Sequence, residues 1–321
     1  MLNKSGAPLE MKTAHILESK GYEVQPGYYN LNEEEDVTRE IDVIGILDSS
    51  PSFDIDGTHI ILETEFDIEC KNMEDFHFFS FPSLFYDGSP DRTSHLVNGY
   101  HLHFWGGALS DFFCSKRVSL VTKDNKKYEG DQKIYEALIQ LKTGVLGRFQ
   151  LWKEIINEDY NHQTRKSELM KIWRGYPDKE KYYYHNKMVP VIGSDKFLKD
   201  HKHMWKEEKF DCLILHILEP VIVINTEVNK VKIEDLKVED YERIGFLNYC
   251  ANFKQNSILC KYGAGLQKPV GISEIESLPK YIEKTENIHK KMFAELEKEL
   301  KNNPERIIAE FIFGQGETLI H

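Results

Sequence analysis

Two short stretches place carboxylates and an ammonium group where they could bind a hard divalent cation. Residues 39–43 (REIDV) and 67–72 (DIECKN) alternate apolar and charged side chains, which predicts two β-strands. Side chains alternate between the faces of a strand, so Glu69 and Lys71 share a face and Asp42 lies on the acidic face of its own strand. Burying this set together without a ligand would be costly. Mg²⁺, which prefers carboxylate oxygens, would resolve the conflict.

A hairpin would bring these groups together. Residues 48–57 are rich in Ser, Pro, Asp and Gly and predict a turn. They separate a strand over 39–47 from a longer strand over 59–71. Pairing of the two strands sets Asp42 beside Glu69.

A helix is predicted before the hairpin, over residues 8–20, and Gly21 suits its end. Glu10 lies on the same helix face as the apolar residues Ala14 and Leu17. It therefore points toward the sheet, or it simply complements the positive N-terminal end of the helix dipole. The spacing alone leaves both interpretations open.

Later segments supply apolar strands and one strong helix. Residues 188–193 and 211–226 are the most apolar stretches of the chain, which fits central strands covered on both faces, and we expect them to pair with the hairpin. Residues 131–156 show apolar side chains at helical spacing, with Gln140 near the middle. Residues 22–30 predict a strand at a sheet edge or a bend, because Pro-Gly interrupts them. Further strands are predicted over 118–122 and 242–253.

Residues 73–114 are aromatic and predict a loop-like insertion. His101 and His103 would share a face of a strand, and paired histidines can bind zinc. No matching Cys or His set lies nearby in the sequence, so we favour packing for this pair and for His201 and His203. The aromatic side chains could stack on bases, but core packing of the insertion is the simpler explanation.

Basic residues gather between positions 157 and 187, interleaved with tyrosines. This mixture suits contact with a nucleic-acid backbone together with base stacking. The alternative is a solvated helical face. The residues we assign to a nucleic-acid interface on this basis are Arg165, Lys166, Lys171 and Arg174.

Composition and charge restrict the classes of protein. The 321 residues are 40% hydrophobic and 29% charged, which is globular usage for one large or two smaller domains. A formal net charge of −12 argues against a surface coated in basic residues for non-specific duplex binding. Five cysteines without a close CxxC pair indicate reduced thiols. Without a signal-peptide core or an apolar run of about 18 residues, we expect a cytoplasmic protein with no membrane partner.

Together these elements resemble the PD-(D/E)XK nuclease superfamily, which has the restriction-endonuclease-like fold. The likeness covers residues 5–72, through the helix with Glu10, the strand opening GYEV, the strand REIDV and the strand ending IECKN. A weaker likeness covers residues 131–226, where the helix with Gln140 and the strand PVIVIN are similar to later core elements of the family. The proline of the family name is absent, since an isoleucine precedes Asp42.

The resemblance implies roles for the charged residues. Asp42 and Glu69 would bind Mg²⁺ (or Mn²⁺) together with the Cys70 carbonyl oxygen, and Lys71 would orient or deprotonate the attacking water. Glu10 would complete the acidic set or hold a second metal. Such a site suits phosphodiester hydrolysis, because a metal activates water and an ammonium adds positive charge near the phosphate. Two residues would support the ligands through hydrogen bonds, Glu40 and Gln140. The alternative is a surface hairpin with ordinary salt bridges.

We therefore expect an α/β protein with a restriction-endonuclease-like mixed β-sheet flanked by helices. Its core would comprise residues 1–72 and 131–260, with an aromatic-rich insertion over 73–130. Residues 261–321 would form a C-terminal extension with an amphipathic helix over 279–302.

The expected function is that of a Mg²⁺-dependent deoxyribonuclease, an endonuclease of restriction, defence or repair type. DNA is the expected partner in preference to RNA, and a homo-oligomer stays open. The alternatives are a nuclease acting on RNA and a catalytically silent binding or assembly module, which the acidic net charge and the long C-terminal helix would suit.

Overall fold

The structure is a computed structural model, and it describes part of the chain. The residues it describes are 7–32, 37–47, 51–55, 58–82, 92–97, 100–105, 113–123, 128–130, 132–141, 171, 181–184, 187–190, 212–234, 237–249, 270–302 and 318–320. We call these the described residues.

Strands outnumber helices among the described residues. The labelled helices are α1 (Ala7–Ser19), the short 3-10 helix η5 (Ile275–Ser277) and α6 (Leu278–Asn302), and a further helix covers 132–141. The strands are β1 (Glu23–Asn32), β2 (Val37–Leu47), β3 (Ser52–Ile55), β4 (Thr58–Lys71), β5 (Phe76–Pro82), β6 (Arg92–Val97), β7 (Tyr100–Trp105), β8 (Cys114–Thr122), β9 (Tyr128–Gly130), β10 (Lys181–Tyr184), β11 (Lys187–Pro190), β12 (Cys212–Ile224), β13 (Val228–Glu234), β14 (Lys237–Arg243), β15 (Phe246–Tyr249), β16 (Val270–Glu274) and β17 (Thr318–Ile320).

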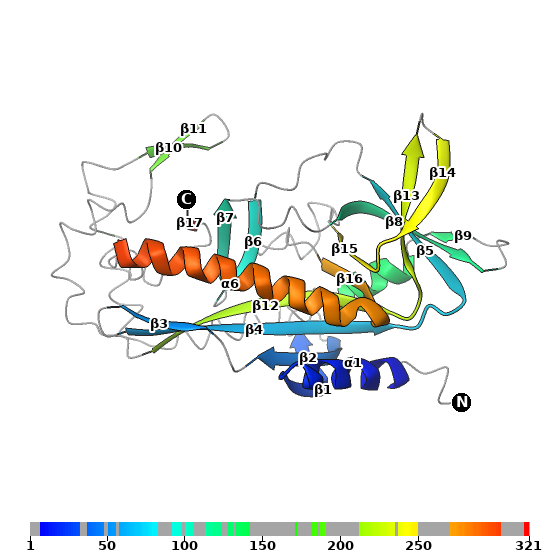
Figure 1. Ribbon diagram of the computed structural model, residues 1–321, viewed down its shortest axis with the longest axis horizontal. Coiled ribbons are helices and arrows are strands. Elements are labelled where there is room, and N and C mark those ends of the chain that lie inside the picture. The colour runs from blue at the N-terminus through cyan, green and yellow to red at the C-terminus, as the bar shows by residue number, and fades with distance from the viewer. Residues whose placement is uncertain are drawn as a thin grey trace.

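Most of these strands join one mixed sheet, in the order β1-β2-β4-β12-β16-β15-β8-β5-β13-β14. β12 lies between β4 and β16 and is parallel to both, whereas β2 runs antiparallel to β4. Figure 1 shows β4 and β12 extended along the long axis of the molecule. The expected α/β class with a mixed sheet is confirmed.

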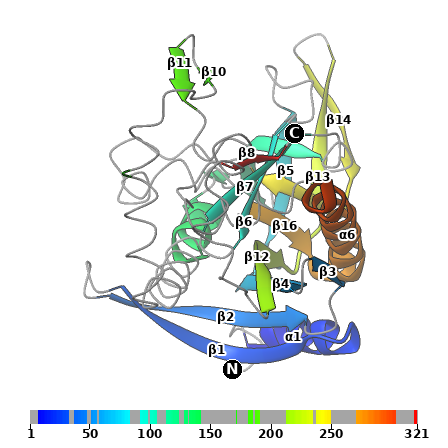
Figure 2. The ribbon, with the colours of Figure 1, turned by 90° about the vertical axis from the view of Figure 1, so that its left-hand side faces the viewer.

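Helices cover both faces of this sheet. Figure 2 shows α1 and α6 on one face and the green helix over 132–141 on the other. In β12, Val221 and Val223 pack into the cluster on the α1 and α6 side, while Ile222 and Ile224 pack into the cluster that includes the helix over 132–141. This alternation follows from the period of two along a strand, and it confirms a central strand buried on both faces.

The helix α1 agrees closely with the prediction over 8–20. Leu9, Thr13 and Leu17 are its buried residues, and their spacing of four places them on one helix face. Gly45 of β2 lets this face approach the sheet, because a Cβ atom there would lie 2.9 Å from Leu17 Cδ1. The predicted edge strand before the hairpin is also confirmed, since β1 stands at one end of the sheet order.

The predicted hairpin is present, but its turn contains a strand. β2 pairs with the C-terminal half of β4, and β3 pairs with the N-terminal half. The predicted turn over 48–57 is therefore wrong for Ser52–Ile55. Phe53 and Ile55 are buried in the core on the α6 side, and their neighbours are exposed. This alternation stabilises a short strand despite the turn-forming residues around it.

The prediction of a loop over 73–114 is wrong, because β5, β6 and β7 lie there. β5 joins the main sheet beside β8, and β6 pairs with β7 and with β12. Phe76 and Phe78 are buried, whereas His77 and Phe79 are only partly buried, so these aromatic residues show the period of a strand. His101 and His103 both lie on β7. The histidines at 201 and 203 lie outside the described residues.

Three further strand predictions have mixed outcomes. The strand over 118–122 is confirmed as part of β8. The pairing of 188–193 with the hairpin is wrong for β11, which pairs with β10 in a separate sheet. A nearby partner across a two-residue connection needs less loop closure than a distant one. The strand predicted over 242–253 is divided between β14 and β15 at Gly245, whose φ of 77° breaks the extended backbone.

Parts of the predicted insertion and extension belong to the same sheet as the predicted core. β5 and β8 come from 73–130, and β16 comes from 261–321. The predicted C-terminal helix is confirmed as α6, which buries Ile282, Ile288 and Met292 in the main hydrophobic cluster. The domain division itself stays a prediction. Among the described residues, no helix is both long enough and apolar enough to cross a membrane.

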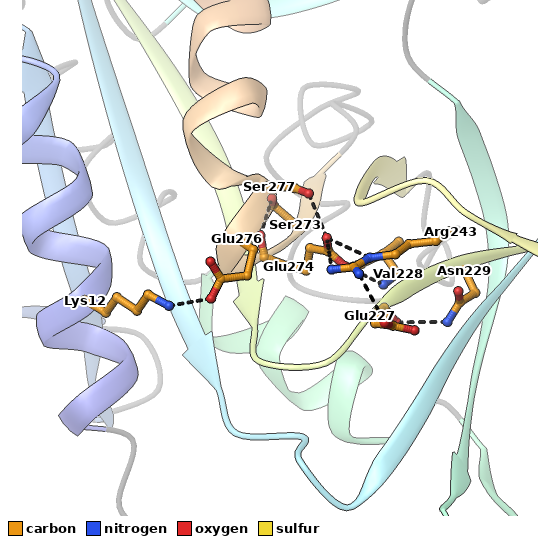
Figure 3. Close-up of polar contacts among 9 residues, drawn as sticks. All are labelled: Lys12, Glu227, Val228, Asn229, Arg243, Ser273, Glu274, Glu276 and Ser277. Carbon is orange, nitrogen blue, oxygen red and sulfur yellow. Dashed lines mark hydrogen bonds and ion pairs between the residues drawn. The ribbon is translucent and has the colours of Figure 1, made fainter.

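A buried glutamate fixes the start of α6 (Figure 3). Glu274, at the end of β16, is 4% exposed. Its carboxylate accepts hydrogen bonds from Arg243 Nη2 at 2.8 Å, from Ser277 Oγ at 2.8 Å and from the Val228 backbone N–H at 3.2 Å. Arg243 also pairs with Glu227 at 3.1 Å. These bonds tie β13, β14 and the beginning of the helical segment into one unit.

Candidate metal and hydrolysis site

Asp42 is held where β2 stops pairing with β4. The final backbone pair at this end of the ladder is Val43 with Ile68, so antiparallel geometry sets Asp42 opposite Glu69. Asp42 Oδ2 accepts a hydrogen bond from the Cys70 backbone N–H at 2.6 Å. Asp42 thus accepts the Cys70 N–H that would otherwise continue the backbone ladder between β2 and β4. This bond fixes the Asp42 carboxylate at the end of the ladder.

Lys71 bridges the sheet and the helix over 132–141. Its Nζ donates to Glu69 Oε1 at 2.5 Å and to Gln140 Oε1 at 3.0 Å. The side chain of Lys71 is 28% exposed and that of Glu69 is 1% exposed. The ammonium therefore has access to solvent on one side, while its carboxylate partner lies in the interior. The structure brings Gln140 to the site, as the resemblance implied.

The second carboxylate oxygen of Glu69 is unsatisfied. Glu69 Oε2 is buried and has no hydrogen-bond partner within the described residues. Burial and the negative charge of Asp42 raise the pKa of Glu69 to about 7, although Lys71 opposes this rise and Glu10 adds to it. A buried acceptor without a donor costs free energy, and a bound cation would remove that cost.

Glu10 belongs to the same electrostatic group, although it comes from α1 on the other face of the sheet. Its negative charge raises the pKa of Glu69 and that of the Cys70 thiol. For Cys70 the largest cause is burial, and the thiol donates to Thr13 Oγ1 at 3.5 Å. The charge of Glu10 therefore acts on the cluster, and the Cys70 side chain faces α1. The direction of the Glu10 side chain toward the sheet stays a prediction.

Several predicted residues are not brought to this site by the structure. The side chain of Glu40 lies outside the described residues, as do Arg165, Lys166 and Arg174. Lys171 is described as exposed and helical, without a contact that links it to the cluster. The nucleic-acid interface proposed for these basic residues stays a prediction.

The sequence reasoning missed two asparagines beside Lys71. Asn225 accepts a hydrogen bond from the Met73 backbone N–H at 2.6 Å and donates through Nδ2 to Asn72 Oδ1 at 3.0 Å. Asn72 Oδ1 also accepts the Glu74 backbone N–H at 3.2 Å. One signal could have found them, since the strands ending IECKN and PVIVIN both close on asparagine and run parallel to each other.

The donor chemistry suits a hard cation, but the present arrangement is not a formed metal site. Among the described residues, no group of three or more His, Cys, Asp and Glu side chains is arranged to hold a metal ion. Lys71 forms an ion pair with Glu69 Oε1. Glu69 Oε2 is buried and has no hydrogen-bond partner among the described residues. Carboxylate oxygens of this kind fit Mg²⁺ or Mn²⁺. For a metal cation to bind Glu69, the Lys71 ammonium would have to share this carboxylate with the metal or move away from it.

Comparison of the chain with known protein families, with curated proteins and with solved structures finds no match.

Proposed function

We propose that this protein is a metal-dependent nuclease with a restriction-endonuclease-like fold, and that it hydrolyses phosphodiester bonds in DNA. The observation that carries the proposal is the state of Glu69. This carboxylate is buried, binds Lys71 through one oxygen and has no hydrogen-bond partner for the other among the described residues, while the charges of Asp42 and Glu10 raise its pKa. An ordinary salt bridge on a surface hairpin would have no buried, unsatisfied oxygen.

The order of elements supports the fold. A helix carrying Glu10 is followed by an edge strand, a hairpin with Asp42 and Glu69, and a strand parallel to β4. The helix over 132–141 supplies Gln140 from the opposite face. This is the arrangement that the resemblance to the PD-(D/E)XK superfamily implies.

Asp42, Glu69 and the Cys70 carbonyl oxygen would hold Mg²⁺ or Mn²⁺, with Glu10 completing the acidic set. When bound, the metal would lower the pKa of a water molecule and neutralise charge on the phosphate. The raised pKa of Glu69 fits this assignment, because a cation would supply the positive charge that the buried carboxylate lacks.

Lys71 would orient the attacking water and place positive charge near the scissile phosphate. It can serve this purpose only if it is released from Glu69 without leaving the site. Gln140 offers the neutral acceptor that retains it, at 3.0 Å. The partial exposure of Lys71 leaves room for a substrate on its solvent side.

Cleavage assays on plasmid, linear and single-stranded DNA with Mg²⁺ or Mn²⁺ test the proposal. Asp42→Asn and Lys71→Met should abolish cleavage. A matched control is Lys301→Met, which removes a lysine from an ion pair of the same 2.5 Å length with Glu297 on α6, where the lysine side chain is 58% exposed. The proposal fails if the wild type does not cleave, or if cleavage survives both Asp42→Asn and Lys71→Met.

A catalytically silent binding module is the second candidate, and the Lys71–Glu69 pair favours it. In the structure, the Lys71 ammonium pairs with Glu69 where a metal cation would bind. Among the described residues, no group of three side chains is arranged to hold a metal ion. Calorimetry separates the two functions, because a module would bind no Mg²⁺ at millimolar metal. An RNA of the same sequence, assayed beside the DNA, tests the remaining alternative of a ribonuclease.

A further inference from the structure

The amide groups of Asn72 and Asn225 have a fixed orientation. The Met73 backbone N–H can only donate, so the atom of Asn225 that faces it must be the oxygen. The amino group of Asn225 then faces Asn72, whose oxygen also receives the Glu74 backbone N–H. Two backbone donors thus determine which end of each amide is oxygen and which is nitrogen.

The chain of hydrogen bonds from Met73 through Asn225 to Asn72 ends at the amino group of Asn72. Within the described residues, no acceptor lies at hydrogen-bonding distance from Asn72 Nδ2, and Asn72 is only partly buried. Both side-chain oxygens in the chain are used, whereas the two N–H donors of Asn72 are left over. The arrangement therefore presents donors only, and it suits a ligand that only accepts.

The open donors stand beside the proposed active site. Asn72 follows Lys71 directly, and Lys71 pairs with Ile224 across the parallel strands β4 and β12. In open α/β sheets, ligands bind at the carboxyl ends of such strands. Lys71 uses two of its three ammonium donors on Glu69 and Gln140, so its third donor is not used by these two acceptors.

We propose that Asn72 contacts a phosphate oxygen of the nucleic-acid backbone through Nδ2, and that Asn225 is the residue that positions it. Phosphate oxygens only accept hydrogen bonds, and asparagine is among the side chains that contact them in protein–DNA interfaces. A neutral donor can bind a phosphate without competing with the metal for Asp42 and Glu69. The inference rests on the proposed function, because it assigns a substrate contact to that same site.

A purely structural clamp between the two strand ends would use the same hydrogen bonds. Asn72→Asp separates the two roles, because a carboxylate keeps the oxygen that accepts from Asn225 and Glu74 and replaces only the open amino group. Asn287→Asp adds the same negative charge at an exposed position on α6 and is the matched control. Asn72→Ser is a neutral second variant that keeps an oxygen for the Glu74 N–H.

The experiment measures KM and kcat for cleavage of a linear DNA duplex in Mg²⁺, and the Kd of the fluorescent duplex in EDTA by anisotropy. Both are measured at low and high salt. Loss of one hydrogen bond to a charged group should weaken binding about tenfold or more. We expect Asn72→Asp and Asn72→Ser to raise KM and Kd at both salt concentrations with kcat little changed. Asn287→Asp should match the wild type, and Asn225→Leu should raise KM less than either Asn72 variant.

The outcomes distinguish this inference from the proposed function. If the wild type cleaves DNA and both Asn72 variants behave like Asn287→Asp, the phosphate contact is refuted and the nuclease function stands. A weakening confined to Asn72→Asp at low salt also refutes the contact, because a screened charge effect would explain it. If the wild type neither binds nor cleaves DNA, the proposed function itself fails.

Discussion

Two of the buried glutamates, Glu69 and Glu274, have different surroundings. Glu274 is 4% exposed, and both of its oxygens accept hydrogen bonds, from Arg243, Ser277 and the Val228 N–H (Figure 3). Glu69 is 1% exposed, and only Oε1 has a donor within the described residues. Glu274 meets a guanidinium and a backbone amide, whereas Glu69 meets one ammonium and the negative charges of its neighbours.

This difference separates a carboxylate that serves only the structure from one that can bind a ligand. A buried carboxylate whose acceptor positions are filled holds strands together and has no capacity for a ligand. One that is buried beside like charges stays costly until a cation joins it. Strongly perturbed carboxylates of this kind occur preferentially at functional sites. Comparison of Glu69 with Glu274 therefore supports the choice of Glu69 as part of the proposed site.

The largest difference that we expect between variants of Glu69 and of Glu274 is in the rate of DNA cleavage. Glu69→Gln should lower the cleavage rate by roughly 10² to 10⁴-fold, the range for loss of a group that supports the chemical step. Glu274→Gln should leave the rate of the folded protein unchanged, because Glu274 lies among structural contacts only. Initial rates on plasmid DNA, taken well below the unfolding temperature of each variant, measure both. Equal losses in the two variants would break the distinction.

The next effect is on the pH dependence of stability in metal-free protein. The pKa of Glu69 is raised from 4.5 to about 7, so the folded state binds the proton more tightly than the unfolded state. Stability is then lost as pH rises through this window, by about 3 kcal/mol in total at 1.36 kcal/mol per pKa unit. Glu69→Gln should unfold like the wild type at pH 4.5 and be more stable at pH 8.

Chemical denaturation of both proteins in EDTA at several pH values checks this sign. The difference between the two proteins isolates Glu69 from all other titrating groups. Mg²⁺ added at pH 8 should stabilise the wild type more than Glu69→Gln, because the cation compensates the ionised carboxylate. A difference that stays constant from pH 4.5 to 8 would contradict the assignment.

The local part of the site could be predicted from the sequence. Alternation of charged and apolar residues set Glu69 and Lys71 on one strand face, and the pairing of β2 with β4 made Asp42 their neighbour, although the connection contains β3. The shared face depends on backbone geometry within a few residues, and the pairing joins strands that lie close to each other along the chain. For the same reason the helix positions of Glu10 and the long α6 were recognisable from spacing alone.

The parts that depend on distant partners were not predictable. β3 and β5 are specified by what they pack against, and aromatic or turn-forming residues concealed their alternation. The link between Asn72 and Asn225 spans 153 positions of sequence, and neither residue belongs to a motif that names the other. A single sequence gives no signal for such pairs until the parallel pairing of β4 with β12 is known.

A smaller effect concerns stability at the structural glutamate. Glu274→Ala should destabilise the protein by about 2 kcal/mol, because it removes charge-assisted hydrogen bonds and leaves the Val228 N–H without its acceptor. The control is Glu297→Ala, which breaks the exposed pair with Lys301 and should cost less than about 1 kcal/mol. Urea denaturation compares the two. If both variants lose the same stability, Glu274 is not the structural member of the comparison.

The smallest expected effect tests how Lys71 is shared. Gln140→Leu removes one acceptor of the Lys71 ammonium and should cost about 1 kcal/mol, less than a fully buried charged hydrogen bond because Lys71 is partly exposed. The matched control is Gln132→Leu, in the same helix, which loses an exposed hydrogen bond to Glu136 at 3.0 Å and should change little.

The double variant Glu69→Gln with Gln140→Leu extends this test. If Lys71 is held jointly, loss of Gln140 should cost more after Glu69 has become neutral, because the ammonium then has neither its charged acceptor nor the Gln140 amide oxygen. Urea denaturation at pH 8 gives the coupling free energy from the two single variants and the double variant. Additive effects would mean that Gln140 does not retain Lys71 when Glu69 is neutralised. Release of Lys71 from Glu69 by a metal would then leave the ammonium unheld, contrary to the role proposed for it.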